Sequence, residues 1–405
     1  MLRTRVLNFT PSWFSVNMGT GVVSILLHEL PFQFRGLGII ANIIFALNVV
    51  LFVLFLLATL ARYLCFRNML RLMLLHPAQS LFTGTFPMGL GTIVNMIVLS
   101  LVPAWGAQWA YVAWALWMVQ SIVSLLTCIG LPFLQFTRHE LAFSTMAGTW
   151  LLPIVAPVVS AASGSVVASV LPPAHARFTL IVAYILWGTA VPTSLLVFGI
   201  LWARLAIHKI PPGSLSVSAF LPVGPCGLGG FSIMNLAAVQ RHLALRGEAA
   251  LGGASLYDAR EQLMFADAVY AGSIVLALIM WGFGFVWLTL AIGSVVRVAG
   301  VRAPSPALTT PQCDMAYIEG GLAFNMGWWG LVFPLGVFAL STNKLSAELD
   351  SGALRVLATI LTVAVLLLWL LCLSLTSYKA ATGELFHSPC LAAVGGEPPS
   401  SIGPS

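Results

Sequence analysis

The chain has 405 residues, of which 59% are hydrophobic and only 7% carry a charge, and its mean hydropathy is +0.98. Soluble globular proteins contain about 25% charged residues, so this composition excludes a protein whose whole surface faces water. A membrane-spanning helix needs about 20 apolar residues, and the chain has room for roughly ten of them. The composition therefore predicts an all-α protein with many membrane spans.

The first twelve residues contain Arg3 and Arg5 but no small-residue cleavage site, so we expect no removable signal peptide. The cysteines Cys65, Cys128 and Cys226 fall in or at the ends of apolar runs, where cysteine acts as a small hydrophobic residue. There is no CxxC pair and no disulfide framework in the sequence. We expect no metal and no cofactor.

Runs without Asp, Glu, Lys or Arg follow one another along the chain, and each is long enough to cross a bilayer. They predict ten helices, at about 13–27, 37–60, 81–101, 107–134, 141–171, 178–203, 219–239, 268–296, 322–342 and 356–378. The predicted organisation is a cytoplasmic N-terminus at 1–12, a ten-helix transport domain at 13–380, and a short, disordered cytoplasmic tail at 381–405.

Basic residues set the expected orientation. With the N-terminus inside the cell, eleven of the 18 Lys and Arg residues fall on the cytoplasmic side, as the positive-inside rule prefers. Both termini are then cytoplasmic. The excess positive charge on that side has two interpretations: attraction to anionic lipid, or a vestibule that concentrates anions, with Arg204 and Lys209 at its mouth.

The odd-numbered helices carry glycine or proline where a plain span would carry leucine or isoleucine. Their anchors recur at intervals of 68, 66, 69 and 112 residues: Gly19, Pro87, Pro153, Pro222 and Pro334. A recurring unit of one broken and one plain helix predicts five tandem helical hairpins. Hydrocarbon cannot satisfy the backbone groups freed at a break, so we expect the odd helices to line a central pore, with the even helices outside. The alternative is that glycine and proline only permit tight helix packing.

None of the five odd helices contains Arg, Lys, Asp or Glu. Dipoles, hydroxyls and amides would then hold the solute weakly, which suits a small anion better than a dicarboxylate that needs arginine forks. The candidate pore-lining or anion-binding residues are Asn17, Gly19, Thr20, Gly21, Thr83, Thr85, Phe86, Pro87, Thr149, Pro153, Pro222, Gly224, Pro225, Asn325, Trp329 and Pro334.

The sequence lacks the motifs of a nucleotide-driven pump and of common membrane-embedded enzymes. No lysine is followed by Ser or Thr as in a Walker A loop, and neither His28-Glu29 nor His139-Glu140 is part of a zinc HExxH motif. There is no GxSxG elbow either. We therefore expect a transporter rather than an enzyme, with no nucleic-acid partner. An anion leaving a negative cell interior needs no other energy source, although a coupled proton remains open.

Several segments resemble one known family. They are Phe82–Thr92 (FTGTFPMGLGT), Ile207–Pro212 (IHKIPP), Gly224–Gly230 (GPCGLGG), Phe324–Pro334 (FNMGWWGLVFP) and Leu354–Ile360 (LRVLATI). They resemble the tellurite-resistance and dicarboxylate transporter family, and within it the fungal sulfite exporters. The wider family includes plant slow-type anion channels and fungal malate permeases. The resemblance covers nearly the whole chain.

The resemblance implies five hairpins around a pore, a plasma-membrane location, and export of sulfite or bisulfite. It implies a pore gate at Phe333, because the family's occluding phenylalanine precedes a proline on the ninth helix. It also implies a homo-oligomer, a trimer by resemblance, with a dimer left open. A malate or other C4-dicarboxylate permease of the same family remains the alternative function.

Overall fold

The computed structural model describes residues 2–211, 213–248, 251, 258–300 and 324–392. Within these ranges the fold is all-helical, without a β-strand. Eight helical segments are long and apolar enough to cross a membrane: Leu37–Cys65, Ser80–Trp105, Gln108–Thr137, Gly148–Ala168, Pro173–His208, Ser216–Leu245, Arg260–Val298 and Gly352–Thr382. The prediction of an all-helical protein with many membrane spans is confirmed.

Two further helices occupy the first and ninth predicted spans but are not among those eight. They are α2 (Phe14–His28), which has 15 residues, and α12 (Trp329–Glu348), which has 20. Both are almost entirely buried. Their short, less apolar sequences are compatible with this position because other helices, rather than lipid, surround them.

The helices form two classes. The central class consists of α2, α5 (Thr85–Met96), α8 (Leu151–Ala168), α10 (Val223–Leu245) and α12. The outer class consists of α3 (Leu37–Cys65), α7 (Gln108–Thr137), α9 (Pro173–His208), α11 (Ala259–Gly300) and α13 (Gly352–Thr382). Burial separates them, since 94% of the most apolar stretch of the span containing α8 is buried, against 22% for α3.

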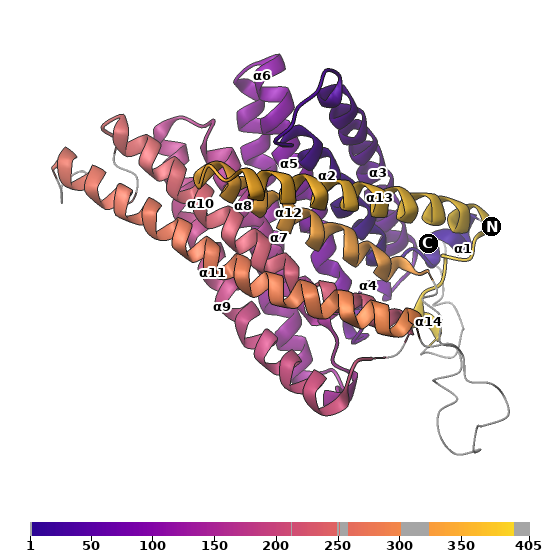
Figure 1. The fold of residues 1–405 in the computed structure, drawn as a ribbon. Coiled ribbons are helices and arrows are strands. Elements are labelled where there is room, and N and C mark those ends of the chain that lie inside the picture. Colours follow the sequence, from indigo (N-terminus) through magenta and orange to yellow (C-terminus); the bar gives the residue numbers. More distant parts are fainter. Residues whose placement is uncertain (1, 212, 249–250, 252–257, 301–323, 393–405) are drawn as a thin grey trace.

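The central helices pack in a closed circuit (Figure 1): α2 on α5, α5 on α8, α8 on α10, α10 on α12, and α12 on α2. Each outer helix packs on the central helix that precedes it in the chain, so that α3 lies on α2, α7 on α5, α9 on α8, α11 on α10, and α13 on α12. The exposed apolar side chains of the outer helices point away from this circuit, as expected for surfaces that meet lipid.

Glycine permits close contact between central helices. A Cβ atom on Gly227 of α10 would lie 2.8 Å from both the N and Cα atoms of Phe338 on α12. A Cβ on Gly84 would lie 2.5 Å from the carbonyl oxygen of Leu152. At these two positions glycine serves helix packing, which is the alternative that the sequence had left open.

The expected breaks differ from those found. A short 3-10 helix leads into each central helix: Pro11–Trp13, Ser80–Gly84, Gly148–Trp150, Gly213–Phe220 and Met326–Trp328. Pro87, Pro153 and Pro225 lie in the first turn of their α-helices, and Pro222 caps α10. Proline is tolerated there because the first-turn N–H groups have no helical partner. Most anchor prolines therefore begin helices; Pro334, inside α12, is the exception.

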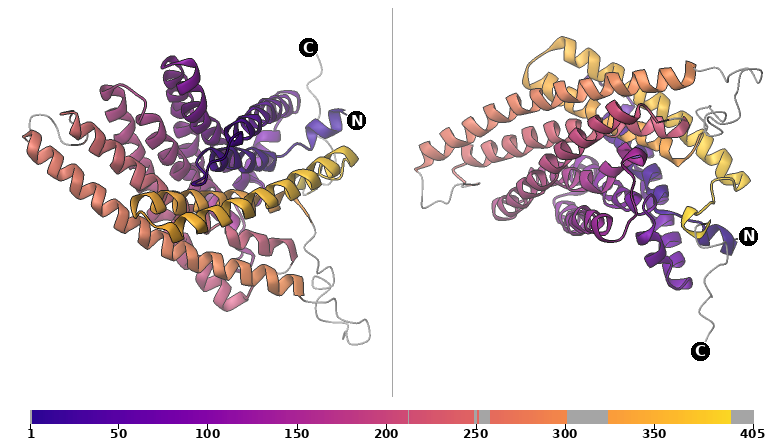
Figure 2. Two further views of the ribbon diagram at one scale, coloured as in Figure 1. Left: turned by 45° about the horizontal axis from the view of Figure 1, so that its top comes forward. Right: turned by 90° about the horizontal axis from the view of Figure 1, so that it is seen from below.

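The remaining helices are short. They are α1 (Leu2–Leu7), α4 (Met69–Leu75), α6 (Val102–Trp105) and α14 (Pro389–Ala392), with a further 3-10 turn at Phe143–Thr145 and a π-helical stretch at Ile97–Leu101 that follows α5. In Figures 1 and 2, α1 and the end of α13 lie at the same end of the molecule. The described part of the predicted tail, through residue 392, packs there.

Arg62 on α3 joins the two ends of the chain. Its side chain is fully buried, and it donates to the carbonyl oxygen of Phe9 (2.6 Å) and to the hydroxyl of Ser388 (2.9 Å). The sequence had treated this residue only as one of the cytoplasmic positive charges. Its charge-assisted hydrogen bonds instead fasten both terminal segments to α3.

We expect Arg62→Gln to release these terminal segments. Each charge-assisted bond contributes about 1.5–3 kcal/mol, so loss of both should raise the rate of tryptic cleavage after Arg5 and Lys379 by a factor of ~100 or more. Arg67→Gln is the matched control, because Arg67 is exposed near the end of the same helix. Equal cleavage rates in the two variants would contradict the anchoring role.

Candidate functional site

The five central helices close around a narrow point. A cavity of about 10 Å³ lies among them, lined by Met18, Met88, Leu151, Leu152, Val155, Leu221, Gly224, Phe333 and Pro334. A buried water needs roughly 10–15 Å³ of such space, so an ion cannot occupy it. This constriction is apolar and closed in the structure.

Each central segment contributes one large apolar side chain at an equivalent position of the constriction. Met18, Leu152, Leu221 and Phe333 each directly precede a predicted anchor residue. In the second hairpin the corresponding lining residue is Met88, which precedes Gly89. The structure therefore shows that Gly89, rather than Pro87, is the equivalent anchor there. The sequence identified only Phe333 of this ring. The residue before each predicted anchor was the signal for Met18, Leu152 and Leu221, but it would have given Phe86 in place of Met88.

A second cavity, of about 220 Å³, lies where the central helices begin, and we name it the N-side cavity. Five of its lining residues lie four positions before an anchor, when Gly89 is taken as the second anchor. They are Ser15, Thr85, Thr149, Ser218 and Gly330. Three residues separate this layer from the constriction layer, which is about 4.5 Å along a helix. Four of its five members carry a hydroxyl group, so a polar ring stands beside an apolar one.

The electrostatics of the N-side cavity favour an anion without a fixed cation. Each helix N-terminus carries roughly half a positive charge from its unpaired N–H groups, and all five central segments begin here. Among the described residues that line the cavity, none has a charged side chain. Such an arrangement attracts a small anion and can release it.

A histidine lies beside the rim of this cavity. The Nδ1 atom of His76 accepts hydrogen bonds from the backbone N–H groups of Ala78 and Gln79, each at 3.2 Å, and Ala78 lines the cavity. Burial lowers the pKa of His76, and nearby His139 acts in the same direction. The neutral imidazole is therefore favoured, and it holds the loop that leads into α5.

Six of the sequence-predicted residues line the central cavities. Thr85, Thr149 and Asn325 line the N-side cavity, and Gly224, Phe333 and Pro334 line the constriction. The Asn325 side chain also caps its own 3-10 turn by accepting from the N–H of Gly327 at 2.7 Å. The structure therefore brings these six to the axis of the circuit.

Other predicted residues point toward the outer helices. The Asn17 amide donates to the side chain of Asn48 on α3 at 3.1 Å. Thr20 accepts from Trp369 on α13 at 3.1 Å. Trp329 donates to Thr376, also on α13, at 3.0 Å. These hydrogen bonds connect the two helices of one hairpin or the helices of neighbouring hairpins. The structure therefore does not support contact between the solute and Asn17, Thr20 or Trp329.

The remaining predicted residues lie at helix contacts, at helix starts or in a lateral groove rather than at the axis. Gly19 and Gly21 allow close contact, because a Cβ on Gly19 would lie 2.6 Å from Trp329 and one on Gly21 would lie 1.9 Å from Thr92. Thr83 and Phe86 line a lateral, largely apolar groove of about 460 Å³ rather than the axis. The buried prolines, placed above at the starts of central helices, are Pro87, Pro153, Pro222 and Pro225.

The two expected vestibule cations are engaged elsewhere. The Arg204 guanidinium donates to the carbonyl oxygens of Ser144 (2.7 Å) and Lys209 (2.7 Å) and is almost fully buried. Lys209 is exposed and donates to the carbonyl oxygen of Ala206 at 3.2 Å. Neither lines the N-side cavity. Their position at the end of α9 was predictable, but their partners were not.

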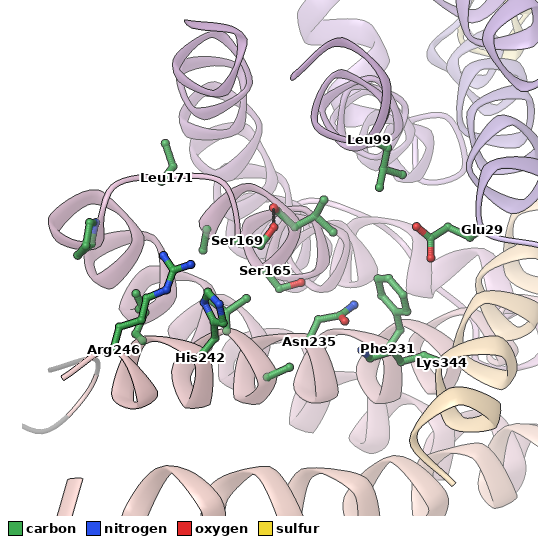
Figure 3. A pocket seen from close by; sticks show the side chains of 16 residues that line it. Glu29, Leu99, Ser165, Ser169, Leu171, Phe231, Asn235, His242, Arg246 and Lys344 are labelled. Atoms are coloured by element: carbon green, nitrogen blue, oxygen red, sulfur yellow. Dashed lines mark hydrogen bonds between the residues drawn. The ribbon is translucent and has the colours of Figure 1, made fainter. Parts of the chain in front are cut away.

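A third cavity, of about 510 Å³, lies where the central helices end, and we name it the C-side cavity. Figure 3 shows its polar lining, which comes from α8 (Ser165, Ser169), from α10 (Asn235, His242, Arg246), and from the ends of α2 and α12 (Glu29, Lys344). No sequence pattern pointed to this cavity, because its charged residues Glu29, Arg246 and Lys344 lie just outside the predicted spans.

The chain is similar to known membrane transporters over almost all of its length. A family model described as "Voltage-dependent anion channel" matches residues 8–377. The sulfite efflux pump SSU1 of Arthroderma benhamiae is 43% identical over 383 residues, which cover 94% of this chain and 93% of the relative. The SSU1 of Trichophyton rubrum is 42% identical, with the same coverage of each chain.

A more distant relative has a different named function. The malic acid transport protein of Schizosaccharomyces pombe is 25% identical over 370 residues, covering 91% of this chain and 78% of the relative. Within the described residues, no cluster of three or more His, Cys, Asp or Glu residues could hold a metal ion. This chain is a multi-pass membrane protein and belongs to the voltage-dependent anion channel (SLAC1) family.

Proposed function

We propose that this protein exports sulfite, as the singly or doubly charged anion, along the axis of the central circuit. One observation carries the proposal: the N-termini of all five central segments meet at a cavity whose described lining has four hydroxyl-bearing side chains and no charged one, directly beside an apolar constriction. Helix N-termini bind small anions through free N–H groups and the helix dipole. Without a fixed cation the binding is weak, which allows rapid release.

The proposed membrane arrangement has ten spans in five hairpins. The circuit of central helices and the pairing of each with the following outer helix support it. In this arrangement α2 and α12 are also spans, although they lie outside the eight that qualify by length and hydropathy. Both are shielded from lipid by α3 and α13, so neither needs a long apolar surface.

We place the N-side cavity on the cytoplasmic side of the plasma membrane, following the positive-inside rule. An anion that enters from the cytoplasm and leaves on the opposite side moves down the membrane potential, gaining about 2.3 kcal/mol per charge per 100 mV. Passive export then needs no second energy source. A homo-oligomer, a trimer by family membership, is part of the same proposal.

Phe333 is the proposed gate. It is the largest side chain of the constriction ring and stands directly before Pro334, inside α12. An aromatic ring at a narrow apolar point blocks an ion by filling the space and by excluding water. Movement of this one ring would open the constriction to the N-side cavity, with which it shares Met18, Leu152 and Leu221.

A C4-dicarboxylate such as malate is the alternative substrate, and the relative from Schizosaccharomyces pombe supports it. The lining of the N-side cavity argues against it, because two carboxylates at fixed separation are best bound by guanidinium pairs. No arginine is among the lining residues that the structure describes. The higher identity to sulfite efflux pumps points the same way.

Reconstituted protein tests the function directly. In proteoliposomes with the voltage set, we expect sulfite flux to exceed malate flux about tenfold and to follow voltage without an imposed proton gradient. Protein-free liposomes supply the background, and nitrate and chloride show the selectivity among small anions. A preference for malate would favour the carboxylate permease. A requirement for a proton gradient would replace passive export by coupled transport.

A further inference from the structure

One face of α10 lines the C-side cavity along most of its length. Phe231, Asn235, Val239, His242 and Arg246 recur at intervals of three or four residues, which places them on one side of a helix. The same helix contributes Gly224 to the constriction. At 1.5 Å per residue, Asn235 lies about 16 Å beyond Gly224 along the axis, and Arg246 about 16 Å farther.

Polar groups on this face are available to a ligand. In the part of the chain that the structure describes, the side chains of Asn235, His242 and Arg246 make no hydrogen bond or ion pair with protein atoms. Across the cavity from them lie Ser165 and Ser169, which are one turn apart on α8 (Figure 3). The groove between the two helices thus offers an amide, an imidazole and a guanidinium in succession.

The charges of the C-side cavity are distributed unequally. Glu29 lines it at the end of α2, while Lys344 on α12 is neutralised by Glu348, with 2.9 Å between Nζ and Oε1. Arg246 is therefore the lining cation without an acidic partner among the described residues. The resulting field directs an anion away from α2 and toward the groove between α8 and α10.

We propose that this groove is the exit path of the anion, with Asn235, His242 and Arg246 as successive binding points for a small inorganic oxyanion. This inference rests on the proposed function. Helix C-termini carry partial negative charge, so an anion leaving on this side meets an unfavourable field at the ends of α2, α8 and α12. The polar face of α10 extends past the C-termini of α2, α8 and α12, and its polar side chains offset the unfavourable field of these C-termini until the anion reaches solvent.

A competing explanation is that Arg246 and His242 only complement the dipole at the end of α10. Flux and stability separate the two explanations. Arg241 provides the matched control, because it lies on the same helix but points toward α11, where its Nε atom donates to Asp267 at 2.6 Å. Arg241→Gln removes the same charge without changing the groove.

The test measures voltage-driven sulfite flux in proteoliposomes, with sulfite supplied on the C-side and ionic strength varied. We expect Arg246→Gln and His242→Gln to reduce flux at low salt on the order of 3- to 10-fold, and the difference from wild type to shrink at high salt. Asn235→Leu should reduce flux at every ionic strength. Arg246→Lys should restore most of the loss, and Arg241→Gln should stay within about twofold of wild type.

Flux is expressed per folded protein, and the thermal midpoint of each variant is measured in detergent. Groove variants that carry sulfite as well as Arg241→Gln does would overturn the exit path, as would a loss of thermal stability with unchanged flux. In either case wild-type sulfite flux would leave the proposed function standing. If wild-type protein carries no anion at all, the proposed function fails first.

Discussion

Phe333→Ala should raise sulfite flux through the reconstituted protein on the order of tenfold, equivalent to ~1.4 kcal/mol removed from the barrier. The reason is geometric. Phe333 contributes the largest side chain to a constriction of about 10 Å³ that borders the N-side cavity. Alanine at this position leaves space for water, and a hydrated passage no longer excludes an ion by dewetting. Single-channel or flux recordings on proteoliposomes at fixed voltage measure the effect.

Phe338→Ala is the matched control for this substitution. Phe338 lies on the same helix and is also buried, but its ring stacks on Trp281 at 5.4 Å between centroids and does not line the constriction. Both substitutions remove a buried ring and should destabilise the fold similarly. A gate at Phe333 therefore requires increased flux in that variant alone. Unchanged flux in folded Phe333→Ala protein would refute the gate.

Gly227→Ala should destabilise the circuit of central helices by about 3 kcal/mol. The added Cβ would lie 2.8 Å from the N and Cα atoms of Phe338 and 2.9 Å from the carbonyl carbon of Val337. These are backbone atoms of α12, so a rotamer change cannot relieve the overlap, and α10 and α12 must separate. The midpoint of thermal unfolding in detergent should fall, together with the yield of folded protein.

Gly188→Ala gives the opposite expectation on an outer helix. A Cβ on Gly188 of α9 would have no other atom within 4 Å. Alanine is favoured over glycine in a helix by about 1 kcal/mol, so this variant should be as stable as wild type or more stable. If both glycine variants had the same thermal midpoint, close contact would not explain the glycines of the central helices.

Much of the fold was predictable from hydropathy and from glycine and proline placement. Long apolar runs require helices in a bilayer, since only helices and closed barrels satisfy every backbone group there. The alternation of plain helices with glycine- and proline-containing ones anticipated the outer and central classes found here. Thr85, Thr149 and Asn325 were predicted to lie near the axis because they are uncharged polar residues of the odd-numbered spans, and Phe333 because of the family resemblance.

The local meaning of the anchors was less predictable. Proline is compatible both with the first turn of a helix and with a break inside a helix, because the backbone nitrogen has no helical hydrogen-bond partner at either position. The sequence could not distinguish these cases, and the structure placed Pro87, Pro153 and Pro225 in first turns. The choice of Pro87 rather than Gly89 as the second anchor shifted the predicted lining by two residues, about 200° around a helix.

The sequence by itself determined that lipid surrounds this protein, where its long apolar segments lie, and that the five predicted odd-numbered spans contain no Arg, Lys, Asp or Glu. Only the tertiary structure decided which polar groups face the axis. Asn17 and Asn48 are 31 residues apart and Thr20 and Trp369 are 349 apart, yet each pair is hydrogen-bonded. A buried amide or hydroxyl must find a partner, and the partner, which depends on how distant helices pack, fixes the direction in which the side chain points.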